Sequence, residues 1–164
     1  LSLLLTSASL SKADLSVALL ATVKRGLVKE TELMLKHGAD PSYRDSQGNS
    51  LLMRASALGY ADVMGVLLKA YGKWKVHHVD SVNLLMHTAL MLAAEREDGE
   101  RCLGMLIHAR ASLDLVDATG ETALIKAART GNVQTVRHLL YHGARADIKD
   151  FKGYSAFKRA AYEG

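Results

Sequence analysis

One unit of about 33 residues recurs along this chain, and this recurrence limits the possible folds more than any other feature of the sequence. Related segments begin, at intervals of 38, 34 and 33 residues, at Ser50, Thr88, Thr122 and Ser155. A set of apolar pairs keeps the same register, with intervals of 33, 39 and 33 residues between Met34, Leu67, Leu106 and Leu139. A repeat of this length is typical of solenoids, in which each unit packs on its neighbours.

The unit from Asp117 to Lys149 shows the expected local structure. Gly120 closes a turn, and Thr122 is typical of the residue that caps the start of a helix. Two stretches with apolar residues at helical spacing follow, ending at Gly131 and Gly143, and an extended return segment completes the unit. Because neither helix can bury its apolar stripe alone, the pair must stack on the next unit.

This pattern resembles the ankyrin repeat family, whose signature reads Asp-x-x-Gly-x-Thr-Pro-Leu-His-x-Ala-Ala-x-x-Gly, then Leu-Leu and Gly-Ala-Asp. The match is most specific from Asp117 to Ala144, and some match covers residues 14–164. The resemblance implies an all-α solenoid of stacked helix-turn-helix units with short extended hairpin connections. It also implies a non-catalytic protein-binding module that uses its concave side, formed by the hairpin tips and first helices.

The chain departs from that signature at two positions of each unit. The proline is replaced by Leu51, Ala89, Ala123 and Ala156, and the histidine by Met53, Met91, Ile125 and Lys158. The hydrogen bonds that this histidine makes in the family must therefore be replaced or absent.

We expect a single domain over residues 1–164, as a module of a larger protein. Its predicted parts are an N-terminal capping helix or tail at 1–13, repeats at about 14–44, 45–82, 83–116 and 117–149, and a partial repeat at 150–164. An apolar content of 49% with only 5% aromatic residues fits helices packed through Ala and Leu. The apolar start lacks preceding basic residues and is too short to cross a bilayer, so we expect no membrane insertion. Cys102 is the only cysteine, which fits a buried thiol in an intracellular, cytoplasmic setting.

The largest irregularity lies between residues 69 and 87, where the unit is five residues longer than 33. Insertions in repeats usually form loops, often on the recognition side. The only tryptophan, Trp74, lies here between two lysines and is a candidate anchor for a partner. Alternatively it folds back over the interrupted repeat, which the rarity of exposed tryptophan favours.

The same stretch contains His77, His78, Asp80 and His87, which together suggest a zinc site at first sight. They lack the paired ligand spacing of zinc sites, so we expect no metal. The sequence also contains neither a Gly-x-Ser-x-Gly elbow nor a phosphate-binding glycine loop. We therefore expect no enzyme activity and no cofactor.

Charge is biased on the surface that the resemblance assigns to recognition. Nine cationic residues stand against Glu95 and Glu121 there: Lys24, Arg25, Arg44, Arg54, Arg96, Lys126, Arg129, Lys149 and Lys152. We expect Arg96 and Arg129 to lie side by side in the groove, with Trp74 and Tyr154 among the contact residues. This bias predicts that a monomeric domain binds an acidic peptide or a phosphorylated chain. A chance excess of cations on a solvated face is the alternative.

Two other functions compete with a protein-binding module. A nucleic-acid binder would show a continuous basic track with stacking aromatics, and only Phe151-Lys152-Gly153-Tyr154 hints at one, so we do not expect nucleic acid as a partner. The net charge of +4 is also low for such a domain. A structural or targeting segment of a larger enzyme or membrane protein remains open.

Overall fold

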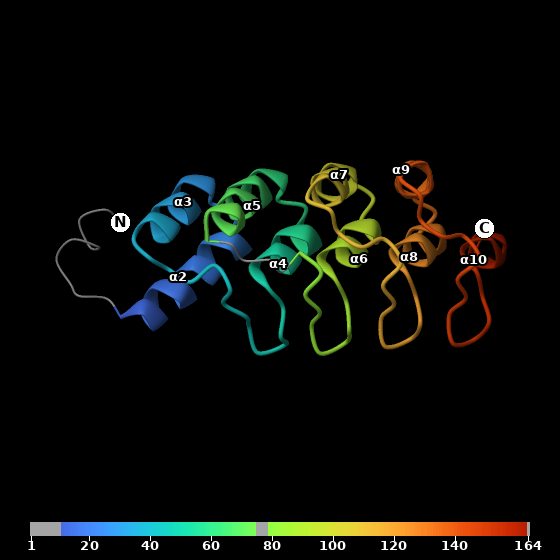
Figure 1. Ribbon diagram of the computed structural model, residues 1–164, viewed down its shortest axis with the longest axis horizontal. Coiled ribbons are helices and arrows are strands. Elements are labelled where there is room, and N and C mark those ends of the chain that lie inside the picture. Colours follow the sequence, from blue (N-terminus) through green and yellow to red (C-terminus); the bar gives the residue numbers. More distant parts are fainter. Residues whose placement is uncertain (1–10, 75–78, 164) are drawn as a thin grey trace.

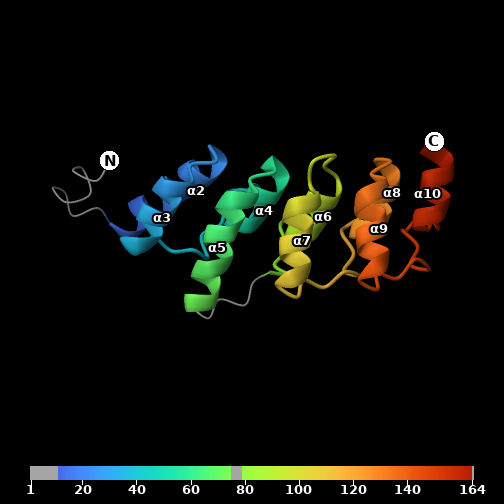
Figure 2. The same cartoon turned by 90° about the horizontal axis from the view of Figure 1, so that it is seen from above.

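The computed structural model describes residues 11–74 and 79–163. Within these ranges the regular elements are helices, and they form two layers that run in one direction along the molecule (Figures 1 and 2). The inner layer contains α2 (Lys12–Lys24), α4 (Leu51–Leu58), α6 (Ala89–Ala94), α8 (Ala123–Arg129) and α10 (Ala156–Glu163). The outer layer contains α3 (Val28–Lys36), α5 (Ala61–Trp74), α7 (Glu100–His108) and α9 (Val133–Tyr141). The predicted all-α solenoid is confirmed.

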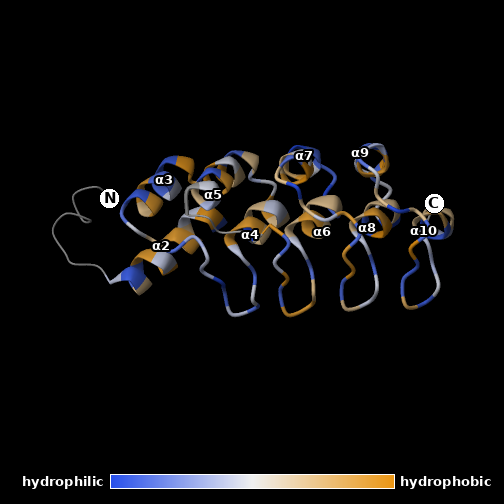
Figure 3. Ribbon diagram, viewed as in Figure 1, coloured by the Kyte–Doolittle hydropathy of each residue, from blue (hydrophilic) through white to orange (hydrophobic). Residues whose placement is uncertain are grey.

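The core lies between the two layers and between successive repeats, where the helices turn their apolar faces (Figure 3). The inner helices are the most completely covered elements, and residues 123–128 of α8 are all buried. Leu52, Leu90 and Leu124 occupy the same place in successive repeats, and each is at most 1% exposed. These positions stack because burial of apolar surface between neighbouring units is the main source of stability in a solenoid.

Polar side chains cap the inner helices as the sequence predicted. The hydroxyls of Ser50, Thr88 and Thr122 each accept a hydrogen bond of 3.2 Å from the backbone N–H three residues later. In two repeats a methionine sulfur takes the place of the family's histidine. Met53 Sδ accepts the N–H of Ser50, and Met91 Sδ accepts that of Thr88, both at 3.4 Å. The expected histidine bond is therefore replaced by a weak sulfur acceptor at these two positions.

Four hairpin turns leave the inner helices on the same side and end at nearly the same level (Figure 1). We name this row of turns, residues 45–49, 83–87, 117–121 and 150–154, the tip edge. Single backbone hydrogen bonds join adjacent turns, from Leu84 N–H to the Gln47 carbonyl, from Ala118 to Leu85, and from Phe151 to Thr119, at 3.1 to 3.2 Å. The tips are therefore held in a fixed order relative to one another.

The extra length of the second repeat lies partly in a helix, although we expected a loop. α5 has 14 residues, whereas α3, α7 and α9 have nine each. The expected loop is thus wrong as far as Trp74, the last residue of α5. The side chain of Trp74 and residues 75–78 lie outside the described part of the chain, so its role as an anchor stays a prediction.

At the other end, α2 begins at Lys12, two residues before the predicted start of the first repeat. Ser11 caps it, with its hydroxyl accepting from the Asp14 N–H at 3.1 Å. Residues 1–10 lie outside the described ranges. Among the helices that the structure describes, none combines the length and the hydropathy needed to cross a bilayer.

Candidate functional site

An ion pair ties three of the four tips to the inner helix that follows. The pairs join residues nine apart, namely Asp45 with Arg54, Asp117 with Lys126, and Asp150 with Arg159. Each aspartate also accepts backbone N–H groups within its own turn, as Asp117 Oδ1 does from Thr119 and Glu121 at 2.8 and 3.0 Å. The three carboxylates are almost completely buried. The aspartate that opens each turn is therefore used up in positioning the tip.

The tip that precedes α6 lacks this pair. Asn83 stands in the aspartate position and Leu92 in the cation position nine residues later. Asn83 keeps the turn geometry, because its Oδ1 accepts the N–H groups of Leu85 and His87, both at 2.9 Å. This repeat has replaced the charged pair with neutral side chains without losing the turn.

Lys126 lies in the most buried part of this network, although we expected it to face a partner. Its side chain is 3% exposed, and its Nζ lies 2.8 Å from Asp117 Oδ2, 3.1 Å from Glu95 Oε1 and 3.4 Å from Glu121 Oε2. Burial alone would lower the pKa of Lys126, but the hydrogen bond to Asp117 and the Glu95 charge raise it above its ordinary value. The prediction that Lys126 is an exposed contact residue is wrong, because nearby carboxylates hold its charge inside the fold.

The pKa of Asp117 is lowered by the same contacts. Burial would raise the pKa of this carboxyl, but bonds from Lys126, from the Thr119 hydroxyl and from two backbone N–H groups lower it to about 2. His87 Nε2, from the preceding repeat, lies 3.3 Å from Asp117 Oδ2. Asp117 therefore joins two repeats through charged and polar contacts.

Arg129 and Arg96 also connect neighbouring repeats. Arg129 Nη2 lies 2.7 Å from Glu95 Oε1 of the repeat before it. Arg96 Nη1 donates to the carbonyl of Ala57 at 3.0 Å, and its Nη2 lies 2.6 Å from Asp98. The expected adjacency of Arg96 and Arg129 is wrong, because Arg129 occupies the repeat position of Glu95, and Arg96 that of Thr130.

The inner face is thus close to electrically balanced within the described residues. Its network contains the cations Arg54, Arg96, Lys126, Arg129 and Arg159 and the carboxylates Asp45, Glu95, Asp98, Asp117, Glu121 and Asp150. The expected ratio of nine cations to two acids is wrong for this face, because aspartates assigned to turns point into it.

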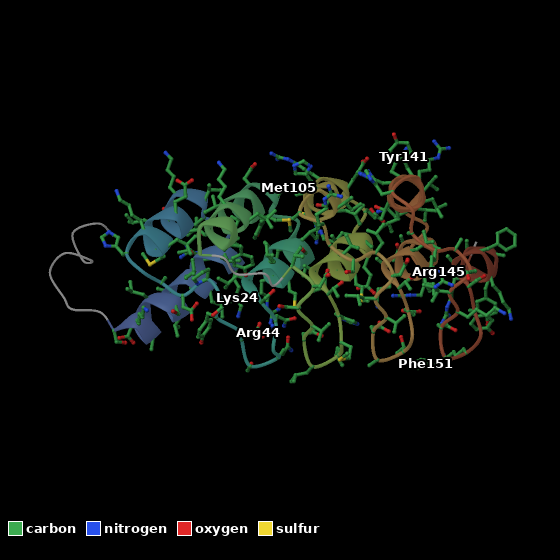
Figure 4. The ribbon with its side chains drawn as sticks, in the orientation of Figure 1. Lys24, Arg44, Met105, Tyr141, Arg145 and Phe151 are labelled. Atoms are coloured by element: carbon green, nitrogen blue, oxygen red, sulfur yellow. The ribbon has the colours of Figure 1, made fainter. Side chains whose placement is uncertain are left out.

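The remaining predicted contact residues lie apart from the network. Lys24, Arg25, Arg44, Lys149 and Lys152 are exposed. Figure 4 shows Lys24 and Arg44 on the N-terminal half of the molecule and Phe151 at the far end of the tip edge. Tyr154 is half-buried, and its ring lies beneath the Lys158 ammonium and stacks with Tyr162.

The metal hypothesis can be examined only in part, because His77 and His78 lie outside the described residues. Asp80 accepts the backbone N–H of Ser112 at 2.8 Å, and His87 faces Asp117. In the ranges that the structure describes, no three His, Cys, Asp or Glu side chains are grouped to hold a metal ion. Cys102 is buried, as predicted, and burial raises the pKa of its thiol.

Comparison with known proteins identifies the repeat. Residues 90–164 match the family model for ankyrin repeats (3 copies). The chain belongs to the ankyrin repeat family. Similar ankyrin-containing relatives are much longer than this chain, and their names differ in activity.

Palmitoyltransferase ZDHHC13 of Homo sapiens is 31% identical over 132 residues, which cover 80% of this chain and 20% of that protein. Palmitoyltransferase AKR1 of Lachancea kluyveri is 31% identical over 136 residues, covering 80% of this chain and 18% of that protein. Ankyrin repeat and KH domain-containing protein mask-1 of Caenorhabditis elegans is 29% identical over 140 residues, covering 85% and 5%. This ankyrin repeat chain therefore spans a fifth or less of these three relatives.

The sequence reading missed one surface feature of the ankyrin array. Leu84, Leu85 and Met86, at the tip before α6, are 77%, 59% and 48% exposed. The signal was present in the sequence, because Asn-Leu-Leu-Met stands where the other tips read Asp-x-x-Gly. It becomes visible only when the four turns are aligned by their place in the repeat.

Proposed function

We propose that this ankyrin repeat chain is a non-catalytic, monomeric protein-binding module that holds an acidic or phosphorylated segment of its partner along the inner helices. Ankyrin repeats are protein-interaction modules, and the groove face of this one carries guanidinium groups in fixed positions. The side chains of Arg54, Arg96 and Arg129 are between 26% and 35% exposed, although each already bonds within the fold.

This half-exposed state is the observation that carries the proposal. A guanidinium has five N–H donors, so a group that bonds within the fold can still donate to a carboxylate or phosphate from outside. Because internal bonds already order these side chains, binding would cost little further side-chain entropy. Lys126 has no such role in the proposal, since its charge is enclosed.

Lys24 and Arg25 extend the surface toward the first repeat. Lys24 stands two residues before Gly26, as Arg129 stands two residues before Gly131, so both occupy the same repeat position. Both Lys24 and Arg25 are exposed, and neither has an ion-pair partner among the described residues. They provide the part of the surface that can be altered without breaking an internal pair.

A phage-displayed library of random peptides, selected on residues 1–164, tests this function. We expect the recovered peptides to be rich in Asp and Glu and to bind more weakly as salt rises. Charge reversal in Lys24→Glu/Arg25→Glu should weaken them about tenfold, since each exposed contact contributes about 1 kcal/mol or less. Lys29→Glu/Lys36→Glu on α3 is the matched control. Peptides without an acidic excess, or equal loss in both variants, would overturn the proposal.

A second candidate rests on the names of the relatives. Two of the three are palmitoyltransferases, so the chain would be the ankyrin region of a larger enzyme of that kind and would bind the proteins that the enzyme modifies. Removing residues 1–164 from the full-length protein should then reduce acylation of bound proteins, while self-acylation of the enzyme is kept. A full-length reading frame with no acyltransferase domain would exclude this candidate.

A further inference from the structure

The tip before α6 exposes three consecutive apolar side chains at the outer limit of the molecule. Leu84, Leu85 and Met86 are exposed, while the corresponding residues of the first tip are Ser46, Gln47 and Gly48. Figure 3 shows the apolar colour on this loop, and Phe151 at the last tip adds a side chain that is 76% exposed. Contiguous exposed apolar groups of this kind mark interaction sites.

The backbone holds this tip firmly in place. Met86 has a φ of 60°, in the left-handed region that Gly48, Gly120 and Gly153 occupy at the other tips. A residue with a Cβ is strained there, so surrounding bonds must impose the conformation. The bonds from Leu84 to Gln47 and from Ala118 to Leu85, with the two that Asn83 accepts, do so. The apolar side chains are therefore presented rigidly rather than by fraying.

Charges on the tip edge are sorted by exposure. The four tip carboxylates, Asp45, Asp117, Glu121 and Asp150, are each at most 9% exposed and are ion-paired. The exposed charges at the tips or directly beside them are the cations Arg44, Lys149 and Lys152. A bound surface would thus meet apolar groups and positive charges, with negative charges withdrawn into the fold.

We propose that the tip edge docks on an anionic phospholipid membrane, with Leu84, Leu85 and Met86 entering the interface and Arg44, Lys149 and Lys152 facing lipid phosphates. Three observations favour a lipid surface over a protein groove. The tips end at one level, which suits a plane (Figure 1). The apolar side chains protrude, as insertion requires, and the nearby exposed cations complement anionic headgroups. This docking is shallow, involves no spanning segment, and does not depend on the acidic groove partner.

Flotation of residues 1–164 with unilamellar vesicles tests the proposal. We expect weak, salt-sensitive binding to vesicles in which a third of the phosphatidylcholine is replaced by phosphatidylserine, and much less to phosphatidylcholine alone. Leu84→Ser/Leu85→Ser should lower the partition constant at least about tenfold, since each lost CH₂ contributes about fourfold. Lys149→Glu/Lys152→Glu should lower it at least about twentyfold, from about fivefold for each charge.

Controls of matched chemistry lie on the outer helices. Val133→Ser/Tyr141→Ser removes two exposed apolar side chains from α9, and Lys29→Glu/Lys36→Glu reverses two exposed lysines on α3. Neither should alter vesicle binding. Met86→Gly removes an apolar side chain while relieving the strained backbone, so a loss of binding in this variant cannot come from unfolding.

Insertion itself can be read from a label. Because Cys102 is buried, Leu85→Cys offers the accessible thiol for an environment-sensitive fluorophore, and Tyr141→Cys offers a control site. A blue shift on anionic vesicles at residue 85 but not at residue 141 is expected. No vesicle binding, binding that tip variants leave unchanged, or tip-dependent capture of peptides without vesicle binding would overturn the proposal, the last in favour of a protein partner.

Discussion

The Lys126→Met variant removes one positive charge from a site where three carboxylates meet it. Nζ lies within 3.4 Å of oxygens from Asp117, Glu95 and Glu121, and the Asp117 side chain is only 2% exposed. Methionine keeps most of the aliphatic stem, so packing changes little. The variant leaves Asp117 and Glu121 buried without their nearest cation.

The cost of that loss can be estimated from Asp117. Its pKa lies at about 2 against an ordinary 3.8, which corresponds to about 2.5 kcal/mol of preference for the charged form. Lys126 is the largest single contributor to that lowering. Breaking a buried pair by removing one partner typically costs 3–5 kcal/mol. We therefore expect Lys126→Met to lower the free energy of unfolding by about 2–3 kcal/mol at neutral pH.

The pH dependence follows from the direction of the shift. Because the folded pKa of Asp117 is depressed, its stabilisation is complete above the ordinary pKa of 3.8 and is lost as pH falls through about 2. In Lys126→Met this contribution is smaller at every pH. The difference in stability between the parent and the variant should therefore be largest near neutral pH and shrink below about pH 4.

Urea titrations followed by circular dichroism at several pH values measure this difference. Lys29→Met, on the exposed face of α3, controls for loss of a lysine as such and should leave stability nearly unchanged. Combining Lys126→Met with Asp117→Asn gives the coupling energy between the two side chains. A loss below about 0.5 kcal/mol at neutral pH, or a difference that is constant down to acid pH, would refute the buried-pair reasoning.

Two further predictions concern the repeat that contains α6. Arg110 has a φ of 66° in the position that Gly38 and Gly143 occupy in other repeats, so Arg110→Gly should raise stability by about 0.5–1 kcal/mol; a lower melting temperature would contradict this. Hydrogen exchange should be faster at residues 79–87 and 95–99 than at 123–140, because this repeat lacks the aspartate–cation pair and α6 has only six residues. Equal protection of the two regions would show that the missing pair does not weaken the array.

Local punctuation made the architecture predictable. Gly131 and Gly143 mark helix ends, Thr122 marks a helix start, and each has these neighbours again about 33 residues away. Such signals depend only on the backbone conformation that a residue permits. The period then fixes which faces stack, so the order of layers follows without any knowledge of individual contacts.

The insertion shows a signal that was read too narrowly. Extra residues in a repeat were expected to loop out, yet Val63, Leu67 and Tyr71 continue one helical stripe at intervals of four and are all buried. Tyr71 at 5% exposure anchors the additional turn of α5. Periodicity should therefore have outweighed the general habit of insertions.

The charged surface could not be predicted by counting side chains. Whether Lys126 is available depends on Asp117, nine residues earlier, and on Glu95 of the previous repeat. Such partners come together only through the rotation between successive repeats, which the sequence does not specify. Removing core positions and adding the remaining charges therefore counted cations that the fold neutralises.

The tip before α6 separates stability from recognition in this chain. Three tips retain an aspartate–cation pair, and those three have glycine in the left-handed position, whereas the fourth has Asn83, Leu92 and a strained Met86. Strain and exposed apolar surface both lower stability, so packing alone does not account for this combination. Met86→Gly should make the fold more stable and vesicle binding weaker, a pair of opposite effects typical of a site shaped by function. If Met86→Gly stabilised the fold and left binding intact, the tip would be a weak turn and nothing more.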